Sequence, residues 1–232
     1  MDPGEYRLTA LLYTIVPVLA ALLGGAMTAF YPPSGWLRSV VQHLAAGVVF
    51  SAAAVEILPD VINAHAPLPA FIGSVLGIAA MVLLQSADNR LRGPIGLTFA
   101  SVVDVFIDGF VLGLSFLHGV RQGLLLTIAL TLELLFLGLS VAAGFGRGSK
   151  VGVIAITACV AFALPIGTAV GLSMGGLSPH ILGGFYAFGL IALLYLVTEE
   201  LLKEAHKIKD TAVMPIAFFA GFVGLMFLDQ LL

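Results

Sequence analysis

Two carboxylates, Asp104 and Asp108, lie inside an apolar run that extends from Pro94 to Leu117. They are four positions apart, so a helix would place both on one face, one turn above the other. A third carboxylate, Glu133, lies inside the next apolar run. An isolated charge in hydrocarbon is too costly to keep, so each of these acids must be protonated or must share a cation.

The spacing of the two runs predicts the depth of Glu133. The connection is centred near residues 119 and 120, so antiparallel helices would lie at equal depth where their residue numbers sum to about 239. Glu133 would then lie about 3 Å in depth from Asp104 and from Asp108, between them, at the helical rise of about 1.5 Å per residue. If it faces them, three carboxylates converge near the middle of the bilayer, which suits a divalent cation.

The direction in which Glu133 faces stays open at this point. Thr127 and Thr131 lie on the opposite side of the same expected helix. Either side of the helix is therefore a candidate for the face that meets Asp104 and Asp108.

The residues around these acids are those of a membrane protein. Of the 232 residues, 60% are hydrophobic and only 10% are charged, and the mean hydropathy is +1.11. A soluble domain of ordinary composition is far more polar. The net charge is −3 and the chain has no basic run, so we expect no nucleic acid partner.

Eight apolar runs are each long enough to cross about 30 Å of hydrocarbon. The predicted fold is therefore an all-α polytopic membrane protein, a single domain over residues 1–232 with eight transmembrane helices in one bundle. We expect the first run to be retained rather than cleaved, because no basic segment precedes it. The runs lie near 7–30, 37–59, 68–86, 95–117, 122–144, 150–172, 181–202 and 211–231.

Basic residues resist translocation and accumulate in short cytoplasmic loops. If the N-terminus is outside, eight basic residues lie inside and two, Arg7 and Arg121, lie outside. Both termini are therefore predicted to be extracytoplasmic. We expect a multi-pass protein of a cell membrane, and the short loops favour a bacterial inner membrane. The inside residues are Arg38, Arg90, Arg92, Arg147, Lys150, Lys203, Lys207 and Lys209.

Small residues recur four positions apart, a spacing that lets helix backbones approach closely in lipid. The lone cysteine, Cys159, is interpreted as a small core residue, because a single thiol forms no internal disulfide. The small-residue sets are Gly73 and Gly77, Gly109 and Gly113, and Gly167, Gly171 and Gly175.

Four segments resemble spans of the ZIP family of divalent metal transporters. The stretch HLAAGVVFSAAAVEILPD, which carries His43, Glu56 and Asp60, resembles the second span of the family, and DVFIDG resembles the fourth-span motif His-Asn-x-x-Asp/Glu-Gly. GGFYAFGLIALLYLVTEEL and AFFAGFVGLMFLDQLL are similar to the seventh and the last span. Eight spans with both termini outside is also the family arrangement, which the loop charges indicate independently.

The resemblance implies a metal site. It puts Asp104 at the leading histidine of the family motif, Asp108 at its acidic ligand and Glu133 at the leading position of the fifth-span motif. It implies one oxygen-dominated site for zinc, manganese or iron, since carboxylates suit manganese and ferrous iron while zinc more often recruits histidine or cysteine. The chain departs from the family where apolar residues replace ligands or prolines, at Val105, Ile107, Phe136 and Leu137.

Five further residues are candidates for a metal pathway. Glu56 and Asp60 are candidates for an outer funnel, His43 for an inner relay, and Glu199 and Glu200 for an inner exit. Each also has an ordinary explanation, as an acid at the level of the lipid headgroups, an interface histidine or a solvated helix end. No role is assigned to the loop histidines His65, His118, His180 and His206.

The expected function is transport of a divalent metal toward the cytoplasm by alternating access. No enzyme activity and no cofactor are expected; the partners are the metal and the bilayer, and a homodimer is kept as a candidate state. One alternative is a proton-coupled carrier that uses the same acids as a relay, and another is a non-transporting relative with a degraded site. The motif Gly-x-Ser-x-Gly at Gly171–Gly175 lacks the strand-turn-helix context of a hydrolase.

Overall fold

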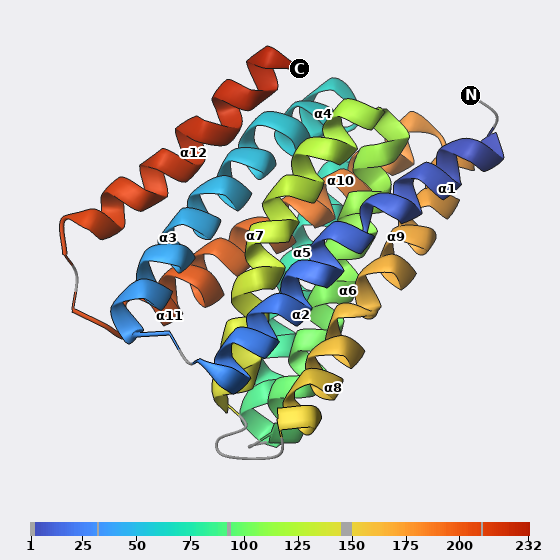
Figure 1. Cartoon of the computed structure of the whole chain (residues 1–232). Helices are drawn as coiled ribbons and strands as arrows, with labels where there is room; N and C mark the ends of the chain where they lie inside the picture. The colour runs from blue at the N-terminus through green and yellow to red at the C-terminus, as the bar shows by residue number, and fades with distance from the viewer. Residues whose placement is uncertain (1–2, 32, 92–93, 145–149, 210) are drawn as a thin grey trace.

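The computed structural model describes residues 3–31, 33–91, 94–144, 150–209 and 211–232. These residues form helices and no strand (Figure 1). Eight helical segments in this part of the chain are long and apolar enough to cross a membrane, and each overlaps one of the predicted runs. The predicted fold, an all-α polytopic membrane protein, is confirmed. The spans are Arg7–Phe30, Gly35–Asn63, Pro67–Ser86, Thr98–His118, Val120–Ser140, Lys150–Gly176, Pro179–Ala205 and Val213–Leu231.

Four spans are continuous α-helices and four are interrupted. The continuous helices are α5 (Pro67–Leu91), α6 (Pro94–His118), α7 (Val120–Gly144) and α12 (Val213–Leu231). The interrupted spans are span 1, with α1 (Pro3–Tyr13) and α2 (Ile15–Phe30); span 2, with α3 (Gly35–Ala52), the π-helix η1 (Ala53–Ile57) and α4 (Leu58–Asn63); span 6, with α8 (Lys150–Ala161), α9 (Ala163–Ser173) and the short 3₁₀-helix η2 (Met174–Gly176); and span 7, with α10 (Pro179–Tyr195), the π-helix η3 (Leu196–Leu201) and α11 (Leu202–Ala205).

Prolines account for the breaks in spans 1 and 6. The helix is interrupted at Thr14 in span 1 and at Phe162 in span 6. In both spans a proline, Pro17 or Pro165, follows three positions later. A proline inside a helix has no N–H to donate, and its ring clashes with the carbonyl of the preceding turn, so the helix yields just before it.

The π-helix of span 2 also precedes a proline. The backbone N–H of Leu58 donates to the carbonyl of Ala53, five residues back. Pro59 follows at once, and a regular α-turn would press its ring against the preceding turn. The wider π-turn relieves that clash, and it carries Glu56 within it. Single π-turns inside α-helices are frequent at functional sites.

The π-helix of span 7 has the same five-residue bond, from the N–H of Leu202 to the carbonyl of Val197. Within it, the hydroxyl of Thr198 donates to the carbonyls of Leu194 and Tyr195, at 2.9 and 3.2 Å. In a π-turn some backbone carbonyls lose their usual α-helical N–H partners. The Thr198 hydroxyl supplies a hydrogen bond to carbonyls of this kind.

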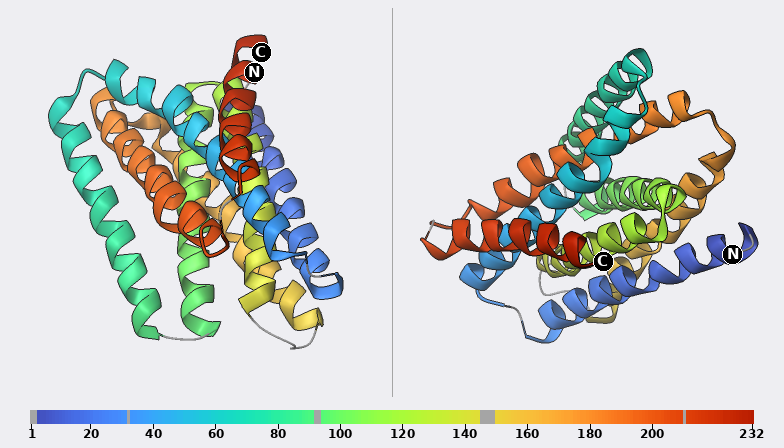
Figure 2. Two further views of the ribbon diagram at one scale, coloured as in Figure 1. Left: turned by 90° about the vertical axis from the view of Figure 1, so that its left-hand side faces the viewer. Right: turned by 90° about the horizontal axis from the view of Figure 1, so that it is seen from above.

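The helices pack as two bundles. In the first bundle, α2 packs along α7 and α6 packs along α9; in the second, α3 packs along α12 and α5 packs along α10. Contacts between the bundles run chiefly from α3 to α7 and from α5 to α6. The first bundle therefore comprises spans 1, 4, 5 and 6, and the second comprises spans 2, 3, 7 and 8 (Figure 2).

Spans 1–3 and spans 6–8 repeat the same features in opposite directions. Spans 1 and 6 carry the proline breaks, and spans 2 and 7 carry the π-helices. The main contacts correspond in the same way: span 1 packs on span 5 as span 6 packs on span 4, and span 2 packs on span 8 as span 7 packs on span 3. Span 1 begins at the end of the molecule where both termini lie, whereas span 6 begins at the other end (Figures 1 and 2). Membrane carriers built from inverted repeats bind their substrates near the midplane, where the repeats meet.

The predicted glycine contacts are confirmed by the packing. A methyl group placed at Gly109 would overlap the backbone carbonyl of Leu164, and one placed at Gly167 would overlap the carbonyl of Phe106. Glycine therefore lets α6 and α9 approach backbone to backbone. The prediction for Cys159 is wrong, since the residue is exposed on the surface of α8.

Candidate functional site

Asp104, Asp108 and Glu133 converge between α6 and α7. One oxygen from each of the three lies within 4.8 Å of the others, and the side chains are only 2%, 3% and 4% exposed. Gly119 alone separates the two helices, which sets their antiparallel register. The predicted depth of Glu133 is therefore confirmed, and the question left open by the sequence is settled: Glu133 faces α6. We call these three residues the acid cluster.

The threonines of α7 explain why the other face of that helix needs no polar partner. The Thr127 hydroxyl donates to the carbonyl of Gly123 at 2.6 Å, and the Thr131 hydroxyl donates to that of Thr127 at 2.7 Å. Each hydroxyl is thus satisfied within its own helix. Only the carboxyl group of Glu133 must find partners outside α7.

No cation balances the acid cluster within the described residues. The ion pairs of this part of the chain lie at the two ends of the bundle, and none includes a member of the cluster. Asp108 Oδ2 and Glu133 Oε2 are buried and have no hydrogen-bond partner. Three charged carboxylates at this distance would repel strongly in a medium of low dielectric constant. Protons or a bound cation must neutralise them.

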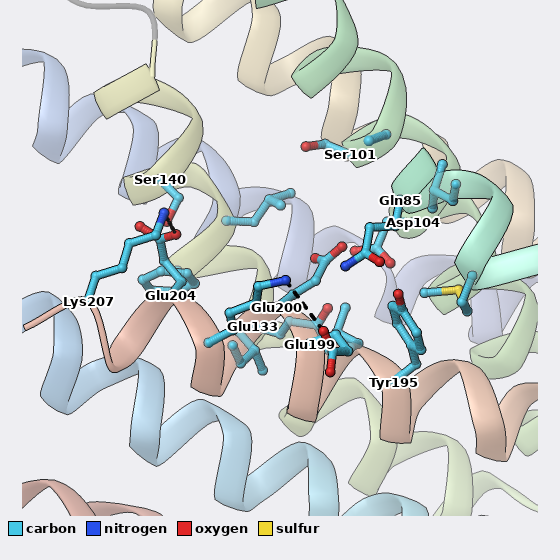
Figure 3. Close-up of a pocket in the computed structure, with 18 of the residues that line it drawn as sticks. Gln85, Ser101, Asp104, Glu133, Ser140, Tyr195, Glu199, Glu200, Glu204 and Lys207 are labelled. Atoms are coloured by element: carbon cyan, nitrogen blue, oxygen red, sulfur yellow. Dashed lines mark hydrogen bonds and ion pairs between the residues drawn. The ribbon is translucent and has the colours of Figure 1, made fainter. Parts of the chain in front are cut away.

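A cavity of about 680 Å³ leads from one end of the molecule to the cluster. Asp104 and Glu133 line its deep part together with Ser101, Gln85 and Tyr195. Figure 3 shows the polar ends of Gln85 and Asp104 turned toward each other in this space. Asp104 and Glu133 therefore face the cavity, whereas Asp108 does not line it.

The second group of predicted residues also lines the cavity. Glu199 and Glu200 belong to η3, and Glu200 is near enough to the acid cluster to interact electrostatically with all three of its members. Glu199 lies at the mouth of the cavity, with Lys203 of α11 and with Lys207, which follows α11. Lys203 pairs with Glu199 at 3.4 Å, and Lys207 pairs with Glu204 (Figure 3). The mouth thus mixes acidic and basic groups, at the end of the bundle that the loop charges assign to the cytoplasm. We refer to it as the inner end.

Glu56 and Asp60 lie near the opposite, outer end and do not reach the acid cluster. Each is only 6% exposed. Asp60 Oδ1 is 3.1 Å from Nε2 of His118, whereas Oδ2 of Asp60 is buried without a hydrogen-bond partner. Glu56 has Asp60, Arg121 and Asp229 as charged neighbours. The two acids predicted to form an outer funnel thus belong to one cluster of charged side chains, but both are buried.

Two contacts between acidic and basic groups connect the bundles here: the ion pair of Arg121 with Asp229, and the contact of His118 with Asp60, which is an ion pair when the imidazole is protonated. His118 ends α6 and Asp60 lies on α4. Arg121 lies in the first turn of α7 and pairs at 2.5 Å with Asp229 near the end of α12. Each pair therefore joins the first bundle to the second. Their position opposes that of the cavity, which opens at the other end of the molecule.

His43 lies on α3 near the inner end, away from the acid cluster. It is 3% exposed, its Nδ1 is 2.8 Å from the carbonyl of Ser39, and its ring contacts that of His206. His43 therefore packs against another imidazole and does not belong to the acid cluster.

Sequence reasoning missed His118, His206, Arg121 and Asp229 as members of these groups. A comparison of depths, like the one made for Glu133, could have brought His118 and Asp60 together, because they lie at the ends of spans 4 and 2, which reach the same side of the membrane. No comparable signal marks His206. Ser173 of the Gly-x-Ser-x-Gly motif lies in the last turn of α9, where its hydroxyl donates to the carbonyl of Val170 at 2.6 Å. The described residues provide no strand-turn-helix context for it.

No protein-family model matches the sequence, and no curated protein is significantly similar to it. The function must therefore be inferred from the geometry of the chain itself.

Proposed function

We propose that this chain is a ZIP-like membrane transporter for a divalent metal cation, and that the acid cluster is the site where the cation binds. One observation carries the proposal: three buried carboxylates from two adjacent spans converge within 4.8 Å, and no cationic side chain among the described residues pairs with them. Carboxylate oxygens suit manganese and ferrous iron and are accepted by zinc. The ion is the substrate and supplies the missing positive charge.

The cavity supports a route for the ion. It connects the cluster with the inner end, and the acids of η3 line it between the two. The outer end is held by two ion pairs between the bundles. This arrangement corresponds to an inward-open state of an alternating-access carrier, in which the first bundle carries the site and moves against the second.

The membrane potential would favour uptake. A divalent cation that crosses to a negative interior gains about 4.6 kcal/mol per 100 mV, at about 2.3 kcal/mol per charge. Uptake into the cytoplasm therefore requires no nucleotide hydrolysis, and the sequence contains no P-loop motif.

Thermal unfolding of the detergent-purified chain tests binding. An ion that binds only the folded state raises the transition temperature, so we expect zinc, manganese or iron(II) to stabilise the wild type. The double variant Asp104→Asn, Asp108→Asn should lose that response. Thr131→Val is the matched control, since its hydroxyl bonds only within α7. The proposal fails if no ion shifts the wild type, or if the double variant responds as the wild type does.

A proton-coupled carrier of another solute is the second candidate. The unpartnered oxygens of Asp108 and Glu133 also suit protonated carboxyl groups, which are neutral and need no cation. The two candidates differ in the thermal experiment, because a pure proton relay gives no metal-dependent stabilisation.

A further inference from the structure

Gln85 of α5 faces the acid cluster from the second bundle. It lines the cavity together with Asp104 and Glu133. Figure 3 shows its amide end and the carboxyl group of Asp104 turned toward each other, with the hydroxyl end of Tyr195 pointing into the same space. Gln85 and Tyr195 belong to α5 and α10 of the second bundle, whereas the acid cluster belongs to the first. The two bundles therefore meet across the cavity at these side chains.

The packing of α5 fixes the direction of Gln85. Met81 and Leu84 are only 2% and 8% exposed, and both line the same cavity. Leu83, on the other side of the helix, is 69% exposed. Residues four positions apart share one face of a helix, so Gln85 continues the inward face that begins at Met81. Its amide is therefore directed into the cavity rather than outward.

The amide group of Gln85 suits a site that is rich in carboxylates. Its oxygen can coordinate a cation, while its NH₂ group can donate to a carboxylate oxygen. Unlike a fourth acid, it adds a donor atom without adding a negative charge to groups that already repel one another. A neutral oxygen ligand opposite Asp104 and Glu133 is therefore the addition that costs the site least in electrostatic energy.

We propose that Gln85 is a specificity-determining residue of the metal site, whose amide oxygen coordinates the ion from the second bundle while the acid cluster holds it from the first. The role rests on the proposed function. A donor set made only of oxygen favours manganese over zinc, since zinc more often recruits nitrogen or sulfur. An ion held from both sides also connects the bundle that carries the acid cluster to the bundle that faces it.

Calorimetric titration with manganese and with zinc tests this role. Gln85→Leu should weaken manganese binding about tenfold, and Gln85→His should raise the ratio of zinc to manganese affinity about tenfold, because imidazole suits zinc. Gln122→Leu and Gln122→His are the matched controls. Gln122 is half-buried like Gln85, but it lies in the first turn of α7 and does not line the cavity. Both controls should bind as the wild type does.

The outcomes separate the role of Gln85 from the proposed function. Unchanged manganese affinity in Gln85→Leu, or the same ratio of zinc to manganese affinity in Gln85→His and Gln122→His, overturns the role of Gln85. The proposed function still holds in that case if the wild type binds an ion and the double variant Asp104→Asn, Asp108→Asn does not. If the wild type binds no ion, both proposals fail.

Paramagnetic resonance of copper(II) shows directly whether position 85 reaches the ion, because a bound imidazole nitrogen splits the copper signal. Gln85→His should gain coupling to one nitrogen relative to the wild type, and Gln122→His should not. The additional coupling should disappear when Asp104→Asn and Asp108→Asn are introduced into Gln85→His. A spectrum of Gln85→His that equals that of the wild type, or an additional coupling that persists without the two acids, contradicts coordination from α5.

Discussion

His118 Nε2 lies 3.1 Å from Asp60 Oδ1, and this contact joins the outer end of α6 to that of α4. The pair connects the bundle that carries the acid cluster to the bundle that does not. Together with Arg121 and Asp229 it holds the outer end, while the cavity opens at the inner end. The two bundles are thus linked by side-chain contacts at the outer end, whereas a cavity opens at the inner end.

We expect that loss of the outer ion pairs shifts the chain toward an outward-open state. His118→Gln combined with Arg121→Gln removes both. Because His118 is 42% exposed, each pair contributes at most about 1 kcal/mol, which corresponds to about a fivefold change in population.

Ser115 provides the readout for this shift, since it is fully buried on α6 between Asp108 and His118. In the background Cys159→Ser, Ser115→Cys, a membrane-impermeant thiol reagent added outside should label the double variant several-fold faster. His65→Ala is the control, because His65 pairs with no acid among the described residues. Unchanged labelling would show that these pairs do not hold the outer end.

Neutral substitution in the acid cluster should stabilise the metal-free protein. Glu133→Gln keeps the shape of the side chain but removes a buried group that has no cationic partner, so the free energy of unfolding should rise by about 1–3 kcal/mol. Thermal unfolding in the presence of a chelator measures this, with Thr131→Val for comparison. A marked loss of stability would mean that the carboxyl group holds the fold together.

The α6–α9 contact should not tolerate a larger residue than glycine. Gly109→Ala places a methyl group against the Leu164 carbonyl, and overpacking of this kind costs about 1–3 kcal/mol. Gly224→Ala is the matched control in α12, because nothing lies within 4 Å of its added methyl group. The control should be neutral or slightly stabilising. Equal thermal stability of the two variants would contradict the close packing of α6 and α9.

The orientation of the chain is tested by cysteine labelling in intact cells. In the background Cys159→Ser, an impermeant reagent should label His180→Cys without treatment, and Lys207→Cys only after the membrane is permeabilised. Both positions are exposed, so accessibility to the reagent depends on the side of the membrane. The reverse pattern would invert the predicted topology.

The sequence predicts what depends on local geometry. The convergence of Asp104 and Asp108 follows from the helical repeat, and the depth of Glu133 follows from one tight turn. The facing of Glu133 requires the structure, because the threonines on the other side of α7 are equally polar in the sequence. Their hydrogen bonds within the helix remove that ambiguity.

Features that depend on distant packing are not predictable in this way. The contact of His43 with His206 joins α3 to the segment after α11, and no spacing rule connects them. The error for Cys159 has a different cause. In a membrane helix both the core and the lipid-facing surface are apolar, so composition does not distinguish them.

Metal uptake into proteoliposomes tests the central claim most directly. With an interior-negative potential, vesicles that contain a manganese- or zinc-sensitive dye should show uptake by the wild type and by Thr131→Val. Asp108→Asn should reduce the rate at least about tenfold, which corresponds to about 1.4 kcal/mol. Uptake that is equal in Asp108→Asn and wild type, or absent in wild-type vesicles for every ion that stabilises the protein, would contradict transport through the acid cluster.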